Sequence, residues 1–371
     1  MKKLLFFVTE DWYFVTHRLD LAIAAKHAGF DVTIVTQVSE HEQVIRNSGL
    51  KLIPISMSRR SLNPISELRL LKTLYSIYRQ EAPNIVHNVT FKPVIYGSLI
   101  AWLLGIHKTV NALAGLGFLF RSKNLQAKVL KYAVRQVLKV LFRRKSNQLI
   151  LQNPDDVQAM QTLGVKPEQI HLIRGAGVNV EQFAPQPKDA KIFTVLIATR
   201  MLWDKGVGEF VAAANIFKTK GLLCRFVLVG SGDDENPSSI PTHQLQSWHD
   251  SGVVEWWGKR SDMPQVLNCA DVVCLPSNYG EGIPKVLIEA ASCAKPIVTT
   301  DTPGCREIVI DRQNGLLVPV ENSLALADAL ETLYHDPKLC QTMGEAGRRM
   351  VTEQFSLGSV VSQTLAVYAQ S

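Results

Sequence analysis

Short runs of apolar residues alternate with helix-length segments along the whole chain. Eight runs are rich in Val, Ile and Leu with few alternating polar residues, namely Leu4–Thr9, Asp31–Thr36, Ile85–Asn88, Gln148–Leu151, Thr194–Ala198, Arg225–Val229, Asp271–Leu275 and Pro296–Thr300. Strands that are covered on both faces have this composition. Amphipathic stretches lie between them, the clearest at Leu19–Ala28, Leu68–Gln80 and Leu324–Tyr334. The alternation predicts an α/β protein whose parallel sheets are covered by helices.

The chain has 371 residues, which is enough for two such domains. The periodicity breaks at Phe183–Lys191, where two prolines and several charges occur together. We therefore expect an N-terminal domain over 1–186 and a C-terminal domain over 187–353, with a last helix at about 354–371 that packs back on the first domain. Two doubly wound sheets that face each other across a cleft would bind ligands at the carboxyl ends of their strands.

Charge divides unevenly between the two halves. Met1–Val180 contains 24 Lys and Arg against 11 Asp and Glu, whereas the rest of the chain contains 16 against 22. A basic half attracts nucleic acid, anionic lipid or a phosphorylated substrate, and charge alone does not choose among these. Because no motif combining aromatic and basic residues for RNA or DNA is present, we expect no nucleic-acid partner.

Targeting and redox signals are weak. The six cysteines form no Cys-x-x-Cys pair, so we expect neither structural zinc nor disulfides. The apolar start of the chain is interrupted by Glu10 and Asp11, which makes it too short for a secretory signal. Val94–Ile106 is also shorter than the ~18 residues that span a bilayer. These features predict a cytoplasmic protein that contacts a membrane only from outside.

Two glutamates lie eight residues apart in the segment Glu281–Ala291, directly after a predicted strand and loop. On a helix that spacing corresponds to an offset of about 80°. Both carboxylates could therefore face one ligand at the helix start, where the backbone N–H groups of Gly282 and Ile283 favour anions. The same spacing is also typical of a solvated helix with two ordinary glutamates.

This segment resembles the Glu-x7-Glu signature of the GT4 family, which comprises retaining glycosyltransferases of the GT-B fold that use nucleotide sugars. Further family-like elements occur in the family's order, namely Thr199–Gly206, Val229–Gly232, Trp257–Gly258, Ala270–Ser277, Asp301–Glu307 and Asn314–Val318. The resemblance covers the whole second half and implies a GT-B architecture of two Rossmann-like domains.

The resemblance also implies roles for single residues. Glu289 would accept hydrogen bonds from the ribose, and Glu281 would accept them from the transferred sugar. Arg200 and Lys205 would neutralise the diphosphate, which gains charge as it leaves. The remaining nucleotide contacts would come from Gly230, Gly232, Trp257, Gly282, Ile283 and Val286. Without a Walker loop or a metal-type Asp-x-Asp, we expect no cofactor and no required metal, and we interpret Asp233–Glu235 as solvated charge.

In the first half, Glu10–Arg18, His87–Pro93 and Asn111–Phe118 resemble a PglA-like branch that assembles capsule and O-antigen. Its members extend lipid-linked oligosaccharides, and PglA-like enzymes add an N-acetylhexosamine to a sugar on undecaprenyl diphosphate. Many GT4 members have a His near Asn111, so we take His87 as the candidate catalytic residue of this half, with Lys92 beside it. A strand-end His and a surface Lys are the ordinary alternatives.

The segment Asn124–Lys145 is amphipathic. On a helix its basic residues fall within roughly 120°, opposite its apolar residues. The basic residues are Lys128, Lys131, Arg135, Lys139 and Arg143, and the apolar ones are Leu130, Ala133, Val134, Val137 and Leu141. The basic face would be solvated or would meet anionic headgroups. The apolar residues just upstream, Leu116, Phe118, Leu119 and Phe120, would insert into lipid or belong to the core.

The sequence therefore predicts a retaining glycosyltransferase. It would move a sugar, expected to be an N-acetylhexosamine, from a UDP-sugar to an undecaprenyl-diphosphate-linked saccharide. It would work at the inner face of the cell membrane, attached peripherally to an anionic surface. A UDP-sugar epimerase of the same fold and a catalytically silent nucleotide-sugar-binding protein are the alternatives.

Overall fold

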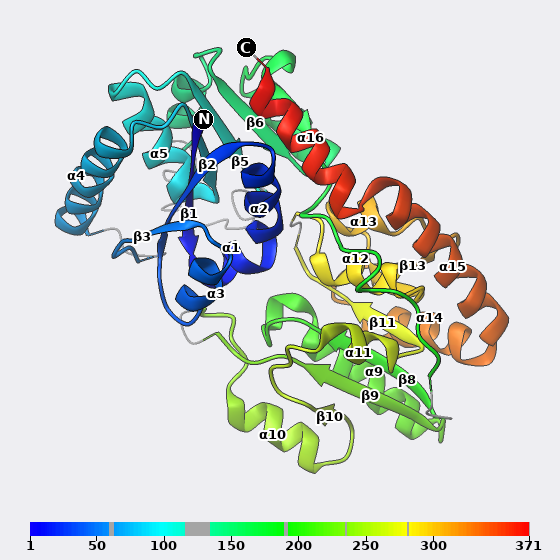
Figure 1. Cartoon of the computed structure of the whole chain (residues 1–371). Coiled ribbons are helices and arrows are strands. Elements are labelled where there is room, and N and C mark those ends of the chain that lie inside the picture. The colour runs from blue at the N-terminus through cyan, green and yellow to red at the C-terminus, as the bar shows by residue number, and fades with distance from the viewer. Residues whose placement is uncertain (59–62, 116–133, 189–191, 234–235, 280–281, 371) are drawn as a thin grey trace. The chain divides into compact units, whose positions relative to one another are not determined.

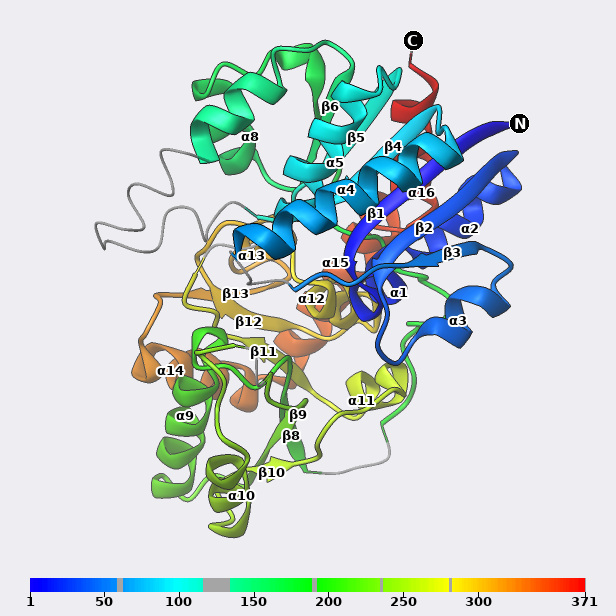
Figure 2. The same cartoon turned by 90° about the vertical axis from the view of Figure 1, so that its left-hand side faces the viewer.

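The computed structural model describes residues 1–58, 63–115, 134–188, 192–233, 236–279 and 282–370. The chain divides into an N-terminal unit, Met1–Ala176 with Val360–Ser371, and a C-terminal unit, Gly177–Ser359. Each unit holds one parallel sheet with helices on its faces (Figures 1 and 2). The predicted α/β class is confirmed, and all eight predicted strands are present.

The N-terminal sheet has the strand order β3-β2-β1-β4-β5-β6-β7. Its strands are β1 Lys2–Glu10, β2 Phe30–Gln37, β3 Lys51–Pro54, β4 Ile85–Val89, β5 Lys108–Ala112, β6 Asn147–Leu151 and β7 Ile170–Leu172. Its helices are α1 Asp11–His17, α2 Leu19–His27, α3 Glu42–Asn47, α4 Pro64–Glu81, α5 Phe91–Leu103, α8 Pro154–Thr162 and α16 Leu357–Ala369, with a turn η1 at Pro167–Gln169. The order reverses between β1 and β4, and ligands bind beyond the carboxyl ends of strands at such a reversal.

The core of this unit explains why its strands lack polar alternation. Leu4 and Phe6 of β1 pack on the face that carries α2 and α16. Leu5 and Phe7 pack on the opposite face, against α4 and α5. Because side chains alternate between the faces of a strand and both faces are covered, residues 4–8 of β1 are all apolar and buried.

The C-terminal sheet has the order β10-β9-β8-β11-β12-β13 and reverses between β8 and β11. Its strands are β8 Phe193–Ala198, β9 Cys224–Val229, β10 Glu255–Trp256, β11 Val272–Leu275, β12 Ile297–Thr300 and β13 Gly315–Val318. Its helices are α9 Val207–Thr219, α10 Thr242–Asp250, α11 Met263–Asn268, α12 Lys285–Ser292, α13 Cys305–Ile308, α14 Ser323–His335 and α15 Pro337–Gln354, with a turn η2 at Trp203–Lys205.

The division between the units differs from the expected boundary after residue 186. Phe183, at the start of the predicted linker, is buried in the C-terminal core. Its carbonyl accepts hydrogen bonds from Ser292 and Arg348. Val178 is hydrogen-bonded to both Phe355 and Leu357. These contacts attach residues 177–186 and 354–359 to the C-terminal unit, which is therefore larger than predicted.

Candidate active site

The predicted cationic residues follow β8, at the point where the C-terminal sheet reverses. Gly206 ends this segment with φ of 73°, and a Cβ there would lie 2.0 Å from the Pro276 carbonyl oxygen. The Asn278 N–H donates to the Asp204 carbonyl at 3.0 Å. The Arg200–Gly206 segment therefore lies directly against the loop that leads from β11 to α12, and only glycine fits at the point of closest approach.

The two cations have different surroundings. Lys205 is only 7% exposed, and its Nζ lies 5.3 Å from the centroid of the Tyr279 ring. The Arg200 side chain is 39% exposed and donates to a carboxylate oxygen of Asp233 at 2.6 Å. Asp233 is thus an ion-pair partner of Arg200, which corrects its interpretation as solvated charge. Residues 234 and 235 lie outside the described residues.

The Gly-rich turn after β9 approaches the end of β8. Gly230 has φ of 138°, and a Cβ there would lie 1.9 Å from the Thr199 carbonyl oxygen. The Gly230 N–H donates to the Gly258 carbonyl at 2.8 Å. At Gly232 a Cβ would lie 2.9 Å from the Ser239 hydroxyl. The two glycines therefore allow this turn to lie close to the end of β8 and to Ser239, and their contact with a nucleotide stays a prediction.

The neighbouring tryptophans separate into two environments. The Trp256 indole N–H donates to the Gly230 carbonyl at 2.8 Å. The Trp257 indole donates to Glu255, and the guanidinium groups of Arg225 and Arg260 each lie 5.9 Å from its ring centroid. The sequence predicts a nucleotide contact for Trp257, and in the structure two guanidinium groups lie beside its ring. Trp256 is the tryptophan that contacts the Gly-rich turn.

Helix α12 carries Glu289, which is 8% exposed. Its carboxylate lies 3.4 Å from Lys285 Nζ, one turn earlier and within the first turn of the helix. Burial raises the pKa of Glu289, and the charge and hydrogen bond of Lys285 offset part of that rise. Gly282 and Ile283 are buried just before the helix, and Val286 is half-buried within it. Glu281 lies outside the described residues.

Sequence reasoning overlooked Lys285. Its position places a cation at the amino end of α12, where the helix dipole also favours anions. Lys285 lies between the two predicted glutamates in the sequence. It precedes Glu289 by four residues, and this spacing places two opposite charges on the same face of a helix. That spacing is the signal from which the sequence could have predicted Lys285.

In the N-terminal unit, His87 lies in the core. It is 1% exposed, stacks on Phe6 at 4.9 Å between centroids, and shares a hydrogen bond of 2.5 Å between Nδ1 and the Tyr368 hydroxyl of α16. Burial, with the charge of Arg18, lowers its pKa well below the usual range. Because helix α16 covers this imidazole, the structure contradicts the prediction that His87 contacts substrate.

Asn111 and the candidate Lys92 also have internal partners. Asn111 is fully buried and accepts hydrogen bonds from Asn88 at 3.0 Å and from Ser98 at 2.9 Å. Lys92 is bound to the Glu67 carboxylate and to the Ser58 carbonyl, each at 2.8 Å. Neither side chain presents an unpaired group to a ligand in this arrangement.

The sheet reversal of this unit carries a feature that the sequence did not reveal. Thr90 follows β4 with φ of 77°, a conformation that costs a β-branched residue energy. Its hydroxyl lies 2.5 Å from that of Thr9, at the end of β1. Backbone strain at a strand end of this kind clusters at ligand sites, and no residue type or spacing announces it.

The basic segment is described only in part. Residues 134–141 are helical, and Arg135, Lys139 and Arg143 are exposed as predicted. Leu141 is buried as predicted, and Leu138 and Phe142 are also buried, whereas Val137 is 38% exposed rather than packed on the sheet. Lys128, Lys131 and the predicted inserting residues Leu116, Phe118, Leu119 and Phe120 lie outside the described residues.

The described part of the chain has no helix that is both long enough and apolar enough to cross a membrane. It also contains no group of three or more His, Cys, Asp or Glu side chains placed to hold a metal ion.

Family models match both halves of the chain. The model described as glycosyl transferases group 1 matches residues 179–350, and the one described as glycosyl transferase 4-like matches residues 3–153. An N,N'-diacetylbacillosaminyl-diphospho-undecaprenol alpha-1,3-N-acetylgalactosaminyltransferase from Campylobacter jejuni is 31% identical over 87% of this chain and 86% of its own. The chain belongs to the group 1 glycosyltransferase family. It is therefore a glycosyltransferase, and the GT4 resemblance is confirmed.

A second curated relative and a solved structure are also similar to this chain over most of its length. A UDP-Gal:alpha-D-GlcNAc-diphosphoundecaprenol alpha-1,3-galactosyltransferase from Escherichia coli is 24% identical over 91% of this chain and 89% of its own. Among solved structures, Anabaena HepE in complex with UDP and glucose superposes with a TM-score of 0.81 at 18% identity, and the match covers 100% of both chains. This likeness confirms the predicted GT-B fold.

Proposed function

We propose that this glycosyltransferase moves an N-acetylhexosamine from a UDP-sugar to a saccharide linked to undecaprenyl diphosphate, with retention of the anomeric configuration. The observation that carries the donor half is the arrangement around β8 and β11. Arg200 and Lys205 follow one strand, Lys285 and Glu289 lie on the helix after the other, and the Gly-rich turn lies alongside. The acceptor half is supported by the two relatives whose names specify diphospho-undecaprenol acceptors.

The proposed roles of the site residues follow from the negative charge that develops on the diphosphate as it leaves. The bond between the anomeric carbon and the β-phosphate oxygen breaks, and that oxygen keeps the electron pair. The acceptor hydroxyl forms the new bond on the same face, and its proton passes to the leaving phosphate. Arg200, Lys205 and Lys285 offset the charge that develops on the diphosphate. Glu289 accepts hydrogen bonds from the ribose. With three cations available, the proposal includes no metal and no cofactor.

The Arg200–Asp233 ion pair gives donor binding a specific first step. Asp233 holds the guanidinium of Arg200 at 2.6 Å. An entering diphosphate presents two negative groups to the same guanidinium, and a planar fork can bind phosphate oxygens in pairs. In the proposed sequence of events, Arg200 exchanges Asp233 for the diphosphate.

We also propose that the enzyme associates peripherally with the inner face of the cell membrane. Arg135 and Lys139, one turn apart in the helical residues 134–141, and Arg143 just after them are exposed and could attract anionic headgroups at about 1 kcal/mol each. Binding to vesicles should then rise with anionic lipid and fall when salt shortens the Debye length. Equal binding to neutral and anionic vesicles would contradict this part of the proposal.

The test of the reaction is a donor screen on a lipid-diphosphate saccharide acceptor, with and without a chelator. We expect transfer from a UDP-N-acetylhexosamine, an α-linked product by NMR, and unchanged turnover in the chelator. A parallel incubation without acceptor should leave the UDP-sugar intact. Formation of an epimer there, or transfer only when metal is added, would contradict the proposal.

A further inference from the structure

Helix α5 is apolar on both of its faces. Val94, Ile100 and Ala101 are buried. On another side of the same helix, Ile95 and Leu99 are half-buried and Trp102 is 52% exposed. Lys92 is the only charged residue of α5. A helix on the surface of a domain usually turns a polar face to water, so the exposed apolar side of α5 requires a second explanation.

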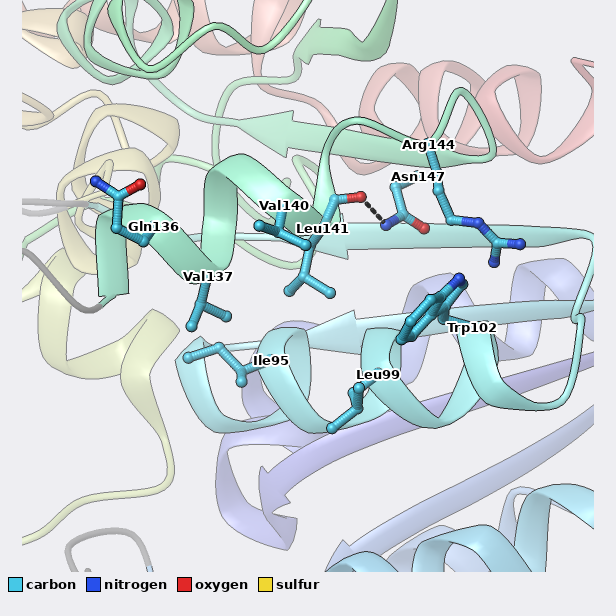
Figure 3. A pocket seen from close by; sticks show the side chains of 9 residues that line it. All are labelled: Ile95, Leu99, Trp102, Gln136, Val137, Val140, Leu141, Arg144 and Asn147. Carbon is cyan, nitrogen blue, oxygen red and sulfur yellow. Dashed lines mark hydrogen bonds between the residues drawn. The ribbon is translucent and has the colours of Figure 1, made fainter.

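This side of α5 forms one wall of a groove. Ile95, Leu99 and Trp102 face Val137, Val140 and Leu141 of the helical residues 134–141 across a cavity of about 540 Å³ (Figure 3). That volume lies within the ~300–1,000 Å³ range of ligand pockets. Val140 is 57% exposed at the opposite wall. The apolar residues that fail to pack on the sheet therefore converge on one elongated space.

The groove starts near the sheet reversal of the N-terminal unit, where parallel sheets bind ligands. Helix α5 begins immediately after Thr90, at the carboxyl end of β4 where the sheet order reverses. From Ile95 to Trp102 the groove follows the helix for about 10 Å. At its far end the Arg144 guanidinium lies 6.0 Å from the Trp102 ring centroid. A molecule held at the strand ends could thus continue along α5.

The lining favours a hydrocarbon chain over a peptide. Most of the residues that line the groove are apolar. The polar Asn147 already donates a hydrogen bond to the Leu141 carbonyl at 2.6 Å, as drawn in Figure 3. A peptide backbone placed here would leave most of its N–H and C=O groups without partners, whereas a hydrocarbon has none to satisfy. In addition, no Asp or Glu occurs between Glu81 and Asp155, where eleven Lys and Arg occur. Both walls come from this cationic stretch, which suits an anionic head group.

We propose that this groove holds the first isoprene units of the polyprenyl chain of the acceptor. The proposal rests on the proposed function, because it takes the acceptor to be a polyprenyl diphosphate. It adds that the enzyme recognises the lipid directly, as a single chain lying between α5 and residues 134–141, and not only through the surrounding bilayer.

The direct test is photocrosslinking in detergent, without a bilayer. The probe is a polyprenyl diphosphate whose first isoprene unit carries a diazirine, and it carries no sugar, so that its capture does not depend on transfer. We expect crosslinks on residues 95–102 and 136–144. Val140→Trp, which fills the groove but keeps it apolar, should remove at least nine-tenths of them. Crosslinks elsewhere, or equal crosslinking of the variant, would overturn the proposal.

Chain-length selectivity supplies the second test. The ratio of kcat/KM for an undecaprenyl acceptor to that for an analogue with a methyl group in place of the whole polyprenyl chain should fall about tenfold or more in Val140→Trp and in Val140→Asp, as when one or two methylene contacts are lost. Leu103→Asp is the matched control, since Leu103 is on α5 and 58% exposed but does not line the groove. Its ratio should match that of the wild type.

The remaining outcomes separate the possible occupants. If Val140→Trp keeps the wild-type ratio but Val140→Asp weakens vesicle binding, the groove contacts the bilayer and the proposal fails. If Val140→Asp instead changes the molecular mass in solution without changing the ratio, a second copy covers the groove and the proposal also fails. Absence of transfer to every acceptor contradicts the proposed function, whereas the crosslinking result still decides the groove.

Discussion

The two units place their chemistry-bearing residues at different depths relative to their sheets. In the C-terminal unit, Arg200 and Lys205 lie beyond the end of β8. In the N-terminal unit, His87 lies inside β4 and Asn111 inside β5, both buried. A side chain inside a strand that helices cover on both faces cannot reach a ligand, whereas one just beyond the strand end can. The motif residues therefore lie beyond a strand end in one unit and inside the buried strands in the other.

The largest effect that would test this difference comes from removing the cations of the C-terminal unit. Turnover with saturating donor should fall by on the order of 100-fold in Arg200→Ala and in Lys205→Met, since each loses one group that offsets the developing charge. Methionine keeps the buried stem of Lys205, so the thermal midpoint checks that the fold survives. Steady-state kinetics gives the turnover.

Asp233→Asn is the control for Arg200→Ala. It breaks the same ion pair but leaves the guanidinium in place, so turnover should stay near the wild-type value. If Asp233→Asn were as damaging as Arg200→Ala, the ion pair itself would be the essential feature, and Arg200 would be as structural as His87.

A smaller effect is expected at Glu289. Glu289→Ala should weaken UDP binding by about 1–3 kcal/mol because the ribose loses its acceptor. Isothermal titration with UDP measures the change. Unchanged affinity in a folded variant would remove Glu289 from the nucleotide site.

The raised pKa of Glu289 adds a pH dependence to this prediction. Burial favours the protonated form, so the carboxylate is lost at a higher pH than for an ordinary glutamate. UDP affinity in the wild type should therefore weaken as the pH falls toward the usual glutamate range and below it. Glu289→Gln, which does not titrate, should lack this component. An identical pH profile in both proteins would contradict the assignment.

The smallest effect concerns the N-terminal unit and stability. Tyr368→Phe should lower the free energy of unfolding by about 1 kcal/mol, because the buried His87 loses its hydrogen-bond partner at Nδ1. Denaturant titration measures it. UDP affinity should not change, since Tyr368 belongs to the other unit. If Tyr368→Phe instead lost turnover while its free energy of unfolding stayed the same, His87 would have a catalytic role.

The lowered pKa of His87 also predicts how the free energy of unfolding changes at acid pH. The pKa of His87 is lowered in the folded protein, so below its unfolded value of 6.5 the unfolded chain binds the proton more readily. The stability contributed by neutral His87 is thus present above pH 6.5 and is lost as the pH falls. A His87→Phe variant that still folds should lose less stability between pH 7 and pH 5 than the wild type does.

Local sequence was sufficient wherever a feature depends on neighbouring residues. The eight apolar runs predicted strands because burial on both faces leaves a signature within each run. The missed strands were short, such as β10, Glu255–Trp256, or contained several polar residues, such as β5, Lys108–Ala112. The Gly-rich turn and the cations after β8 were also found locally, because a strand end and the turn that follows it are adjacent in sequence.

The sequence by itself determined the α/β class, the two sheets and the positions of the cations and glycines that follow β8 and β9. Only the tertiary structure decided that His87 is covered by Tyr368, which lies 281 residues away. It also decided that Val137 and Val140 face a groove, and that Thr90 adopts a positive φ at a strand end. The physical reason is that burial, strain and cavities depend on which elements from distant parts of the chain pack together. The local pattern of residues does not show which elements these are.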